Sequence, residues 1–275
     1  RQPMDQPGRY FYVRDRDSDD YWSTSWQPVG KSLSEYESVC RHGTAYTVIE
    51  SRYAEIASES TYFVPLDRLF ECWLLKLTNE SACRRTLSVF TYVEFANTWD
   101  LQQDFHNMQF SQYLADGALV DGRCIRFGTC TNLAAGPPAR EPTAGPGNFL
   151  FLGAAGAPVA GYETDREVFL GPYRTYANPL AVERGYCEGT DVHGGNGCGV
   201  LQFDIVLEPG ASEELLVILG LGRAETVGAA ALAEFDSPAK ARQALEAVKA
   251  HWHSRIGSLE THTPDHEFDS MINVW

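Results

Sequence analysis

The sequence predicts a mainly β protein built as a large antiparallel sandwich, and three observations support this fold class. Short segments rich in β-branched and aromatic residues recur through the first 220 residues. Polar turn clusters such as Thr78–Ser81 and Glu208–Ala211 separate these segments, with little helical periodicity between them. A composition with 44% hydrophobic and 12% aromatic residues can fill the core of one large domain or two smaller ones. Repeated strands with short turns favour sheets packed face to face.

The expected strands follow one another along the chain, and each combines β-branched or aromatic residues with a turn signal at its ends. They are residues 10–13, 45–49, 60–64, 72–77, 87–93, 200–206 and 215–219. Residues 134–161 are rich in Gly, Ala and Pro and break this rhythm. We expect them to form a long surface loop flanking one short strand at 149–152.

After Gly222 the hydrophobic period changes from two to about 3.6, which predicts helices. Ser237 fits an N-cap and Pro238 the favoured first helical position. One apolar face follows at spacings of three or four, made by Ala241, Leu245, Val248, Trp252 and Ile256. A second helix is expected to start at Thr263 and Pro264. Its apolar stripe reaches the last residue without a C-cap, so we expect the chain to be a piece of a longer protein.

Charge and cysteine content argue against several classes of partner. With 22 Lys plus Arg against 37 Asp plus Glu, the formal charge is −15, and no dense basic cluster is present, so nucleic acid is not an expected partner. The most apolar run, 215–221, is too short for a membrane span of about 20 residues, so no membrane contact is expected. Seven cysteines without a CxxC pair favour a reducing cytoplasm. The chain begins at Arg1 and not at Met, so the sequence does not exclude a leader on a longer precursor.

Two clusters have the composition of a metal site but the wrong spacing. The first crowds four carboxylates into one hexapeptide: Asp15, Asp17, Asp19 and Asp20. It lacks the Gly and Glu of a calcium loop, so we interpret it as a solvated hairpin turn. The second, formed by Cys187, His193 and Cys198, lacks the paired spacing and fourth donor of a zinc site. No metal is expected.

The glycines between this His and the last Cys, in the run Gly194–Gly199, are followed by a strand and not by a helix. They therefore predict a tight turn with positive φ angles in place of a phosphate-binding loop.

Glu94 ends an apolar strand, so it is expected to be partly buried. A carboxylate in such a place must be paired or have a raised pKa, and either state could serve catalysis. One Glu is not the carboxylate pair of a glycosidase, and no GxSxG elbow supports serine hydrolysis. We expect a structural salt bridge from Glu94 to Arg41 or Arg174.

The segment 99–113 has the composition of a sugar-binding surface, which needs flat aromatic faces beside planar polar groups. Its aromatic residues are Trp99, Phe105, Phe110 and Tyr113, and its amides are Gln102, Gln103, Asn107, Gln109 and Gln112. An ordinary strand or loop with a polar outer face is the alternative.

A set of motifs follows one order from near Arg9 to the last residue. The motifs are Gly8–Asp15 with Tyr21–Val29, Cys40–Gly43, Tyr62–Pro65, Leu87–Phe95, Asp165–Arg174, Asn178–Glu183, Gly195–Leu201 and Met271–Trp275. Together they resemble the inverting β-glycoside phosphorylases of glycoside hydrolase family 94, which includes cellobiose, cellodextrin and chitobiose phosphorylases.

This resemblance implies a galactose mutarotase-like super-β-sandwich followed by linker helices and an (α/α)6 barrel. Members cleave a β-glycosidic bond with inorganic phosphate as co-substrate, invert the anomeric centre and release an α-sugar-1-phosphate. Their general-acid Asp and phosphate-binding residues belong to the barrel, so no catalytic residue and no cofactor are expected in this chain. The implied organisation is a sandwich over 1–222, linker helices over 223–262 and, over 263–275, the start of the first helix toward the barrel.

The resemblance also implies a homodimer in which the sandwich of one subunit borders the active site of the other. The partner-reaching loop matches residues 107–110, so Asn107, Gln109 and Phe110 are expected to contact sugar in the partner's site. Members acting on cellobiose tend to carry Gln-Arg where this chain has Gln109-Phe110, which indicates an aromatic platform in place of a charge.

Four functions remain open. The leading one is assembly and substrate selection in a phosphorylase acting on cello-oligosaccharides or cellobiose to give α-glucose-1-phosphate. The alternatives are a chitobiose-type substrate, a stand-alone carbohydrate-binding or dimerisation module, and a mutarotase-like enzyme in which a His and a Glu converge.

Overall fold

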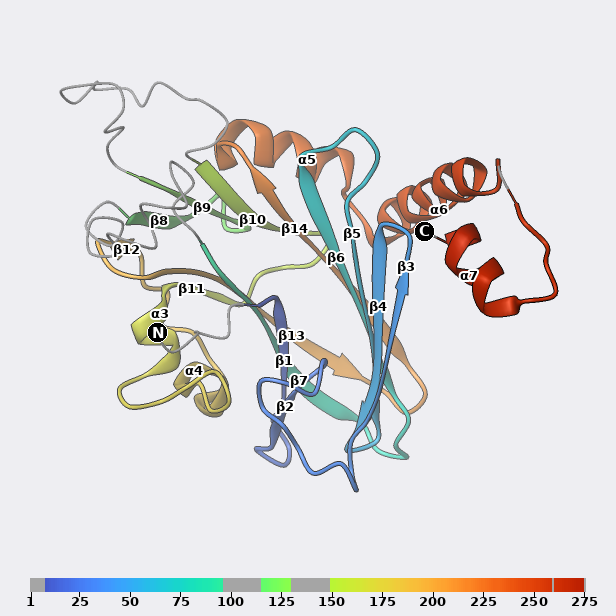
Figure 1. Ribbon diagram of the computed structural model, residues 1–275. Helices are drawn as coiled ribbons and strands as arrows, with labels where there is room; N and C mark the ends of the chain where they lie inside the picture. Colours follow the sequence, from blue (N-terminus) through green and yellow to red (C-terminus); the bar gives the residue numbers. More distant parts are fainter. Residues whose placement is uncertain (1–7, 96–114, 130–148, 259, 275) are drawn as a thin grey trace.

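The computed structural model describes residues 8–95, 115–129, 149–258 and 260–274, and the structural statements below concern these residues. They form two antiparallel sheets packed face to face, with helices on the outer faces (Figure 1). The expected mainly β, antiparallel sandwich is confirmed.

The smaller sheet has five strands in the spatial order β11-β13-β7-β1-β2. In that order their bounds are Gly161–Asp165, Gly197–Leu207, Arg85–Glu94, Tyr10–Asp15 and Tyr21–Ser23. The larger sheet has nine strands in the order β12-β8-β9-β10-β14-β6-β5-β4-β3. Their bounds are Val192–His193, Ala115–Val120, Cys124–Thr129, Phe149–Ala155, Ser212–Leu221, Phe70–Asn79, Ile56–Phe63, Tyr46–Tyr53 and Glu37–Gly43.

All seven strands expected from aromatic and β-branched runs are present, and the expected hairpin of β1 and β2 around the Asp cluster is confirmed. The short strand at 149–152 is confirmed as β10, but it lies inside the larger sheet between β9 and β14. Residues 134–148 of the expected loop lie outside the described residues. The strands β3, β8, β9, β11 and β12 were not predicted. Strands β8 and β11 are poor in strand-forming residues, and β11 and β12 pair with strands that are distant in the chain.

Three apolar clusters follow from this layering. The core between the sheets includes Phe11, Trp22, Trp73, Leu75, Val89, Phe203 and Val217. Burial of each such side chain contributes about 1.5–3 kcal/mol. A second cluster lies on the outer face of the larger sheet under the C-terminal helices, and a third lies on the outer face of the smaller sheet.

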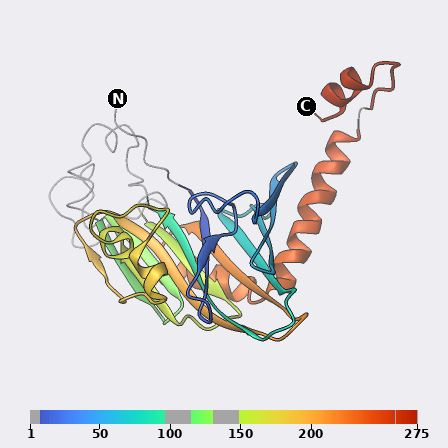
Figure 2. The same cartoon turned by 90° about the horizontal axis from the view of Figure 1, so that it is seen from below.

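The outer face of the smaller sheet is covered by two short helices, α3 (Arg166–Leu170) and α4 (Leu180–Arg184). The outer face of the larger sheet is covered by a π-helical turn η3 (Ala224–Gly228), by α5 (Ala229–Glu234) and by α6 (Pro238–Ile256). Figure 2 shows that α6 and then α7 (His266–Val274) project away from the sandwich.

The predicted start of α6 is confirmed at Pro238, and Ala241, Leu245 and Val248 of the predicted apolar face are buried. The predicted start of α7 was two residues too early. Asp265 Oδ1 accepts hydrogen bonds from Glu267 N (3.0 Å) and Phe268 N (3.1 Å), so Asp265 is the N-cap and not Thr263.

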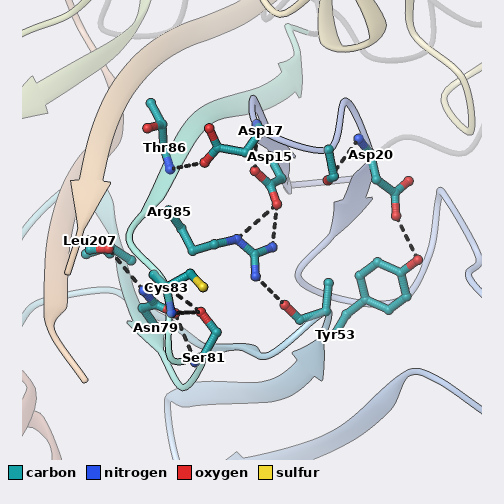
Figure 3. Close-up of polar contacts among 12 residues, drawn as sticks. Asp15, Asp17, Asp20, Tyr53, Asn79, Ser81, Cys83, Arg85, Thr86 and Leu207 are labelled. Atoms are coloured by element: carbon teal, nitrogen blue, oxygen red, sulfur yellow. Dashed lines mark hydrogen bonds and ion pairs between the residues drawn. The ribbon is translucent and has the colours of Figure 1, made fainter. Parts of the chain in front are cut away.

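One end of the sandwich, called the closed end here, is tied together by buried polar groups (Figure 3). Arg85 at the start of β7 donates to Asp15 Oδ2 at the end of β1 (Nε, 3.0 Å) and to the carbonyl of Ala54 in the turn between β4 and β5 (3.1 Å). Asn79 at the end of β6 donates to Leu207 O (3.0 Å) of β13. The contacts of Arg85 with Ala54 and of Asn79 with Leu207 cross from one sheet to the other.

Replacing Arg85 tests the closed end. Arg85→Met leaves Asp15, whose side chain is 2% exposed, as an unpaired buried charge, and should lower the free energy of unfolding by about 3–5 kcal/mol. Arg84→Met is the matched control, because Arg84 and Glu208 form a pair that is 63% and 68% exposed and should lose under about 1 kcal/mol. Urea unfolding midpoints give both values, and equal losses would contradict the assignment.

Candidate functional site

The candidate site lies where β7 stops at Glu94, opposite the closed end. The residues expected to contact sugar, Asn107, Gln109 and Phe110, lie outside the described residues. Both flanks of their segment are described: Phe95 N donates to Gly197 O (3.2 Å), and Gly194 N donates to Ala115 O (2.8 Å). Residues 194–197, called the 194–197 turn, therefore hold the chain on either side of residues 96–114 (Figure 1).

The 194–197 turn depends on glycine. Gly194 has φ 74° and Gly195 has φ 141°, angles that residues with a Cβ rarely adopt. A Cβ on Gly197 would lie 2.0 Å from Cε2 of Phe127, so only glycine fits against that ring. The expected tight turn leading into a strand is confirmed, since β13 begins at Gly197.

Glu94 is the charged centre of the site. Its Oε1 accepts hydrogen bonds from the hydroxyl of Tyr92 (2.9 Å) and from the hydroxyl of Tyr176, and Arg166 Nη1 lies 3.6 Å away. The Glu94 side chain is 19% exposed, as its place at the end of an apolar strand suggested. The expected salt bridge is present in the described structure.

The expected partners of Glu94 were wrong. Arg41 pairs with Glu50, and Arg174 pairs with Glu183. Sheet topology is the reason, because the strand order β11-β13-β7 brings the start of α3 beside the end of β7.

Arg166 is held in place by the N-terminus of α3. Asp165 caps the helix by accepting from Glu167 N (2.8 Å), and Arg166 N donates to Asn196 O (3.0 Å) in the 194–197 turn. Burial lowers the pKa of the Arg166 guanidinium, but its hydrogen bond to Glu167 and the charge of Glu94 outweigh burial and raise the pKa overall. Arg166 is therefore a fixed positive charge between two carboxylates.

Tyr92 and Tyr12 are neutral hydrogen-bond donors. Burial raises the pKa of Tyr92 and of Tyr12 well above the usual value, and neighbouring acidic groups add to the effect. The Tyr12 hydroxyl donates to Tyr176 O (2.9 Å), and the rings of Tyr92 and Phe169 stack with centroids 5.0 Å apart. This end of the sandwich is thus a rigid aromatic layer with its hydroxyl groups engaged.

Glu163 on β11 lies directly behind the site. Its side chain is completely buried, Oε1 accepts from Thr190 N (3.1 Å), and Oε2 has no hydrogen-bond partner among the described residues. Burial raises the pKa of the Glu163 carboxyl to about 7, and hydrogen bonds from Asp165 and Thr190 offset this in part. No sequence pattern pointed to this residue.

The three residues of the possible zinc cluster do not form one site. His193 Nδ1 lies 2.8 Å from Asp116 Oδ1, while Cys198 and Cys187 pack in the apolar cluster on the outer face of the smaller sheet. Across the described ranges no group of three or more His, Cys, Asp or Glu residues could hold a metal ion. The four carboxylates of the first cluster contact protein groups, Asp15 with Arg85, Asp17 with Thr86 N, Asp19 with Arg14 and Asp20 with Lys31.

The described residues around Glu94 can bind and position polar groups of a ligand. Among them, no nucleophile is paired with a general base. The mutarotase-like alternative needs a His beside a Glu, whereas His193 faces Asp116 and Glu94 faces tyrosines.

A shallow groove of about 330 Å³ on the outer face of β3 to β6 is lined by polar and small side chains without an aromatic ring, so it is no sugar platform. None of the described helices is long and apolar enough to cross a membrane.

The sequence matches the family described as "Glycosyl hydrolase 94, supersandwich domain" over residues 1–248. The chain belongs to this family. The resemblance noted from the motifs is thereby confirmed.

Several curated relatives of this chain are disaccharide phosphorylases by name. N,N'-diacetylchitobiose phosphorylases from Vibrio proteolyticus and Vibrio furnissii are 37% and 33% identical to it over 99% of this chain and 32% of their own length. A solabiose phosphorylase from Paenibacillus borealis is 26% identical over 97% of this chain and 33% of its own length. The chain therefore spans about a third of the length of these relatives.

Sequence reasoning missed Arg166, Tyr176 and Asn196 as parts of the site. A signal was present for one of them, because Asp165 followed by Arg166-Glu167 fits a helix N-cap with an acidic first turn. The roles of Tyr176 and Asn196 depend on contacts with residues 82 and 29 positions away, which no local pattern encodes.

The buried carboxyl of Glu163 makes stability depend on pH. Between pH 4.5 and about 7 the native state binds a proton that the unfolded chain has already released, so stability falls as pH rises through this window. Glu163→Gln removes this titration. The difference in free energy of unfolding between the variant and wild type should therefore shift by about 3 kcal/mol in favour of the variant as pH rises from 4.5 to about 7. Chemical unfolding on both sides of the window measures this. Glu188→Gln, on an exposed residue paired with Arg184, is the control, and parallel curves for Glu163→Gln and wild type would contradict the prediction.

Proposed function

We propose that this chain is the supersandwich domain of an inverting disaccharide phosphorylase and that the parent enzyme acts on N,N'-diacetylchitobiose. The observation that carries the substrate is the higher identity to the two chitobiose phosphorylases, 37% and 33%, than to the solabiose phosphorylase at 26%, over nearly the whole chain in each case. This substrate was the alternative to the cello-oligosaccharide or cellobiose type favoured by the sequence.

In this proposal the domain assembles the enzyme and selects the substrate, and it carries no catalytic residue. The described site supports such a role, since its charged and hydroxyl groups are engaged with one another around Glu94. The general acid and the site for inorganic phosphate belong to an (α/α)6 barrel that forms the domain's partner, and the enzyme works as a homodimer. We place the protein in the cytoplasm, and the six described cysteines, all free thiols, support this location.

Asn107, Gln109 and Phe110 are proposed to contact the sugar in the partner subunit. An amide offers a donor and an acceptor to neighbouring hydroxyl groups, and an aromatic ring covers the apolar face of a pyranose. The hydrogen bonds of the 194–197 turn fix the described flanks of this segment, which supports its use as a positioned contact.

Substrate choice is tested with the full-length enzyme and inorganic phosphate. N,N'-diacetylchitobiose should give N-acetylglucosamine 1-phosphate with kcat/KM roughly 10⁴-fold above cellobiose, because a site built to bond the acetamido group rejects a sugar lacking it. Phosphate-dependent release of glucose 1-phosphate from cellobiose or cellodextrins at equal or higher kcat/KM would contradict this proposal and favour a cellobiose-type or cello-oligosaccharide-type substrate. The 275-residue chain assayed alone should release no sugar phosphate, and tight sugar binding by it alone would favour the stand-alone binding module.

The contact by Phe110 is tested in the same enzyme. Phe110→Ala should raise KM for the acceptor sugar roughly tenfold with little change in melting temperature, because it removes a stacking face and not a core side chain. Phe203→Ala is the matched control: Phe203 is 1% exposed in the core, and its truncation should cost about 3–5 kcal/mol of stability. Unchanged kinetics with a large fall in melting temperature for Phe110→Ala would show that Phe110 is a core residue.

A further inference from the structure

Strands β3 and β4 bring a thiol, an imidazole and a hydroxyl group into one row at the β3 edge of the larger sheet (Figure 1). Cys40 Sγ lies 3.5 Å from His42 Nε2, and His42 Nδ1 lies 3.0 Å from Thr47 Oγ1. Cys40 and His42 are exposed, and Thr47 is half-buried. This Cys40–His42–Thr47 row places a nucleophile beside a base, and the base beside a group that can orient it.

The pleat of the sheet produces the row. Residues two apart in a strand point to the same face, so Cys40 and His42 are neighbours on one face of β3. The pairing of β3 with β4 puts His42 opposite Thr47 and Cys40 opposite Ile49. Opposite residues have Cβ atoms about 4.5–5.5 Å apart, so the Thr47 hydroxyl meets the imidazole and not the thiol. A two-residue turn joins the strands and fixes this register.

The contact with Thr47 assigns a role to each ring nitrogen of His42. When Nδ1–H donates to Thr47 Oγ1, the lone pair of Nε2 points toward the Cys40 thiol. Nε2 can then take the thiol proton as the sulfur attacks. Such a base speeds the attack because the thiolate, and not the thiol, is the nucleophile.

The other described cysteines lack this arrangement. Burial raises the pKa of four of them above the usual thiol value, which makes them unreactive: Cys72, Cys124, Cys187 and Cys198. Cys83 is exposed like Cys40, but its thiol makes no hydrogen bond with a described residue. Among the cysteines that the structure describes, exposure and a neighbouring base therefore coincide only at Cys40.

A metal site and a hydrolase site explain the row less well. Two donors are too few to hold a metal, and the described residues contain no group of three or more His, Cys, Asp or Glu that could do so. The groove on the outer face of β3 to β6 is lined by Ser38 and Val39 but not by Cys40 or His42, so it does not place a substrate against the thiol. The row suits a small reagent that arrives from solvent.

We propose that Cys40 is a site of reversible thiolation by a low-molecular-weight disulfide, with His42 as the base. Cys40 Sγ attacks one sulfur of the disulfide while its proton moves to His42 Nε2. A bond forms between Sγ and that sulfur, the S–S bond of the reagent breaks, and the departing thiolate takes the proton from His42. Cys40 is oxidised to a mixed disulfide and half of the reagent is reduced to a thiol, so no other oxidant is needed.

Such a site responds to the redox state of its surroundings. Where free thiols are in excess, they remove the mixed disulfide and Cys40 stays reduced. When small disulfides accumulate, Cys40 reacts before the other described cysteines. The inference rests on contacts within β3 and β4 and does not depend on the proposed substrate.

The rate of thiolation in the full-length enzyme tests the site, with hydroxyethyl disulfide as an uncharged probe. After quenching with acid, peptide mass spectrometry gives the rates of mixed-disulfide formation at Cys40 and at Cys83 in the same sample. At pH 7 Cys40 should react roughly tenfold faster or more, because the base adds to exposure. Excess dithiothreitol should remove the adduct. A rate at Cys40 equal to or below that at Cys83 would overturn the proposal.

Replacing the base separates proton transfer from packing. His42→Gln keeps a side chain that can bond to Thr47 but cannot take a proton, so the rate at Cys40 should fall roughly tenfold while the rate at Cys83 stays unchanged. Between about pH 7 and pH 9 the rate at Cys40 should rise more steeply in His42→Gln than in wild type, because without a base the thiol must first ionise in solvent. Thr47→Val, which leaves the base but not its orienting group, should slow Cys40 less than His42→Gln does.

Arg41→Gln is the matched control for charge. Arg41 lies between Cys40 and His42 in sequence but points to the other face of β3, where it pairs with Glu50. The variant should leave the rate at Cys40 nearly unchanged, with a melting temperature close to that of wild type. A rate at Cys40 that is unaffected by His42→Gln, or lowered equally by Arg41→Gln, would show that His42 is not the base.

Discussion

Arg85, which pairs with the buried Asp15 inside the smaller sheet, fixes the two sheets to each other at the closed end. Arg85 also donates to the carbonyl of Ala54, in a turn where Ala54 and Glu55 have φ of 49° and 61°. Non-glycine residues pay roughly 1–2 kcal/mol each for such angles, so this tight connection of β4 and β5 needs support from outside the turn. Arg85 and the bond from Glu80 N to Glu55 O (2.9 Å) supply it. One side chain thus sets the spacing of the sheets and stabilises a strained hairpin.

The opposite end of the sandwich follows from this constraint. Strand β7 has ten residues and runs from Arg85 to Glu94, which places Glu94 roughly 30 Å from the closed end. Antiparallel pairing with β13 sets Cys198 beside Glu94, so the 194–197 turn and the start of α3 gather there. The position of the candidate site is therefore a consequence of strand length and register.

Local composition predicted the buried strands, because Val89, Phe90 and Tyr92 favour a strand in any setting. It could not predict β8 or β11, whose Gly, Ala and Asp residues become strand through pairing with β9 and β13. The buried carboxylate at the end of β7 was predicted, but its partner Arg166 was not, because the choice among distant arginines is decided by strand order. The amide-rich segment 99–113 was recognised from composition, and its contacts to sugar stay a prediction.

The electrostatics of the described site explain why the proposed chemistry belongs elsewhere. Phosphate needs cations whose charge is not already compensated. Arg166, the cation at the centre of the site, is 18% exposed and lies between Glu94 and Glu167. The field of a chain with a net charge of −15 further opposes an approaching anion. A neutral sugar carries no such penalty and gains from amide and aromatic contacts. Under the proposed function, charge therefore assigns the neutral sugar to this domain and the phosphate to a basic site on another part of the enzyme.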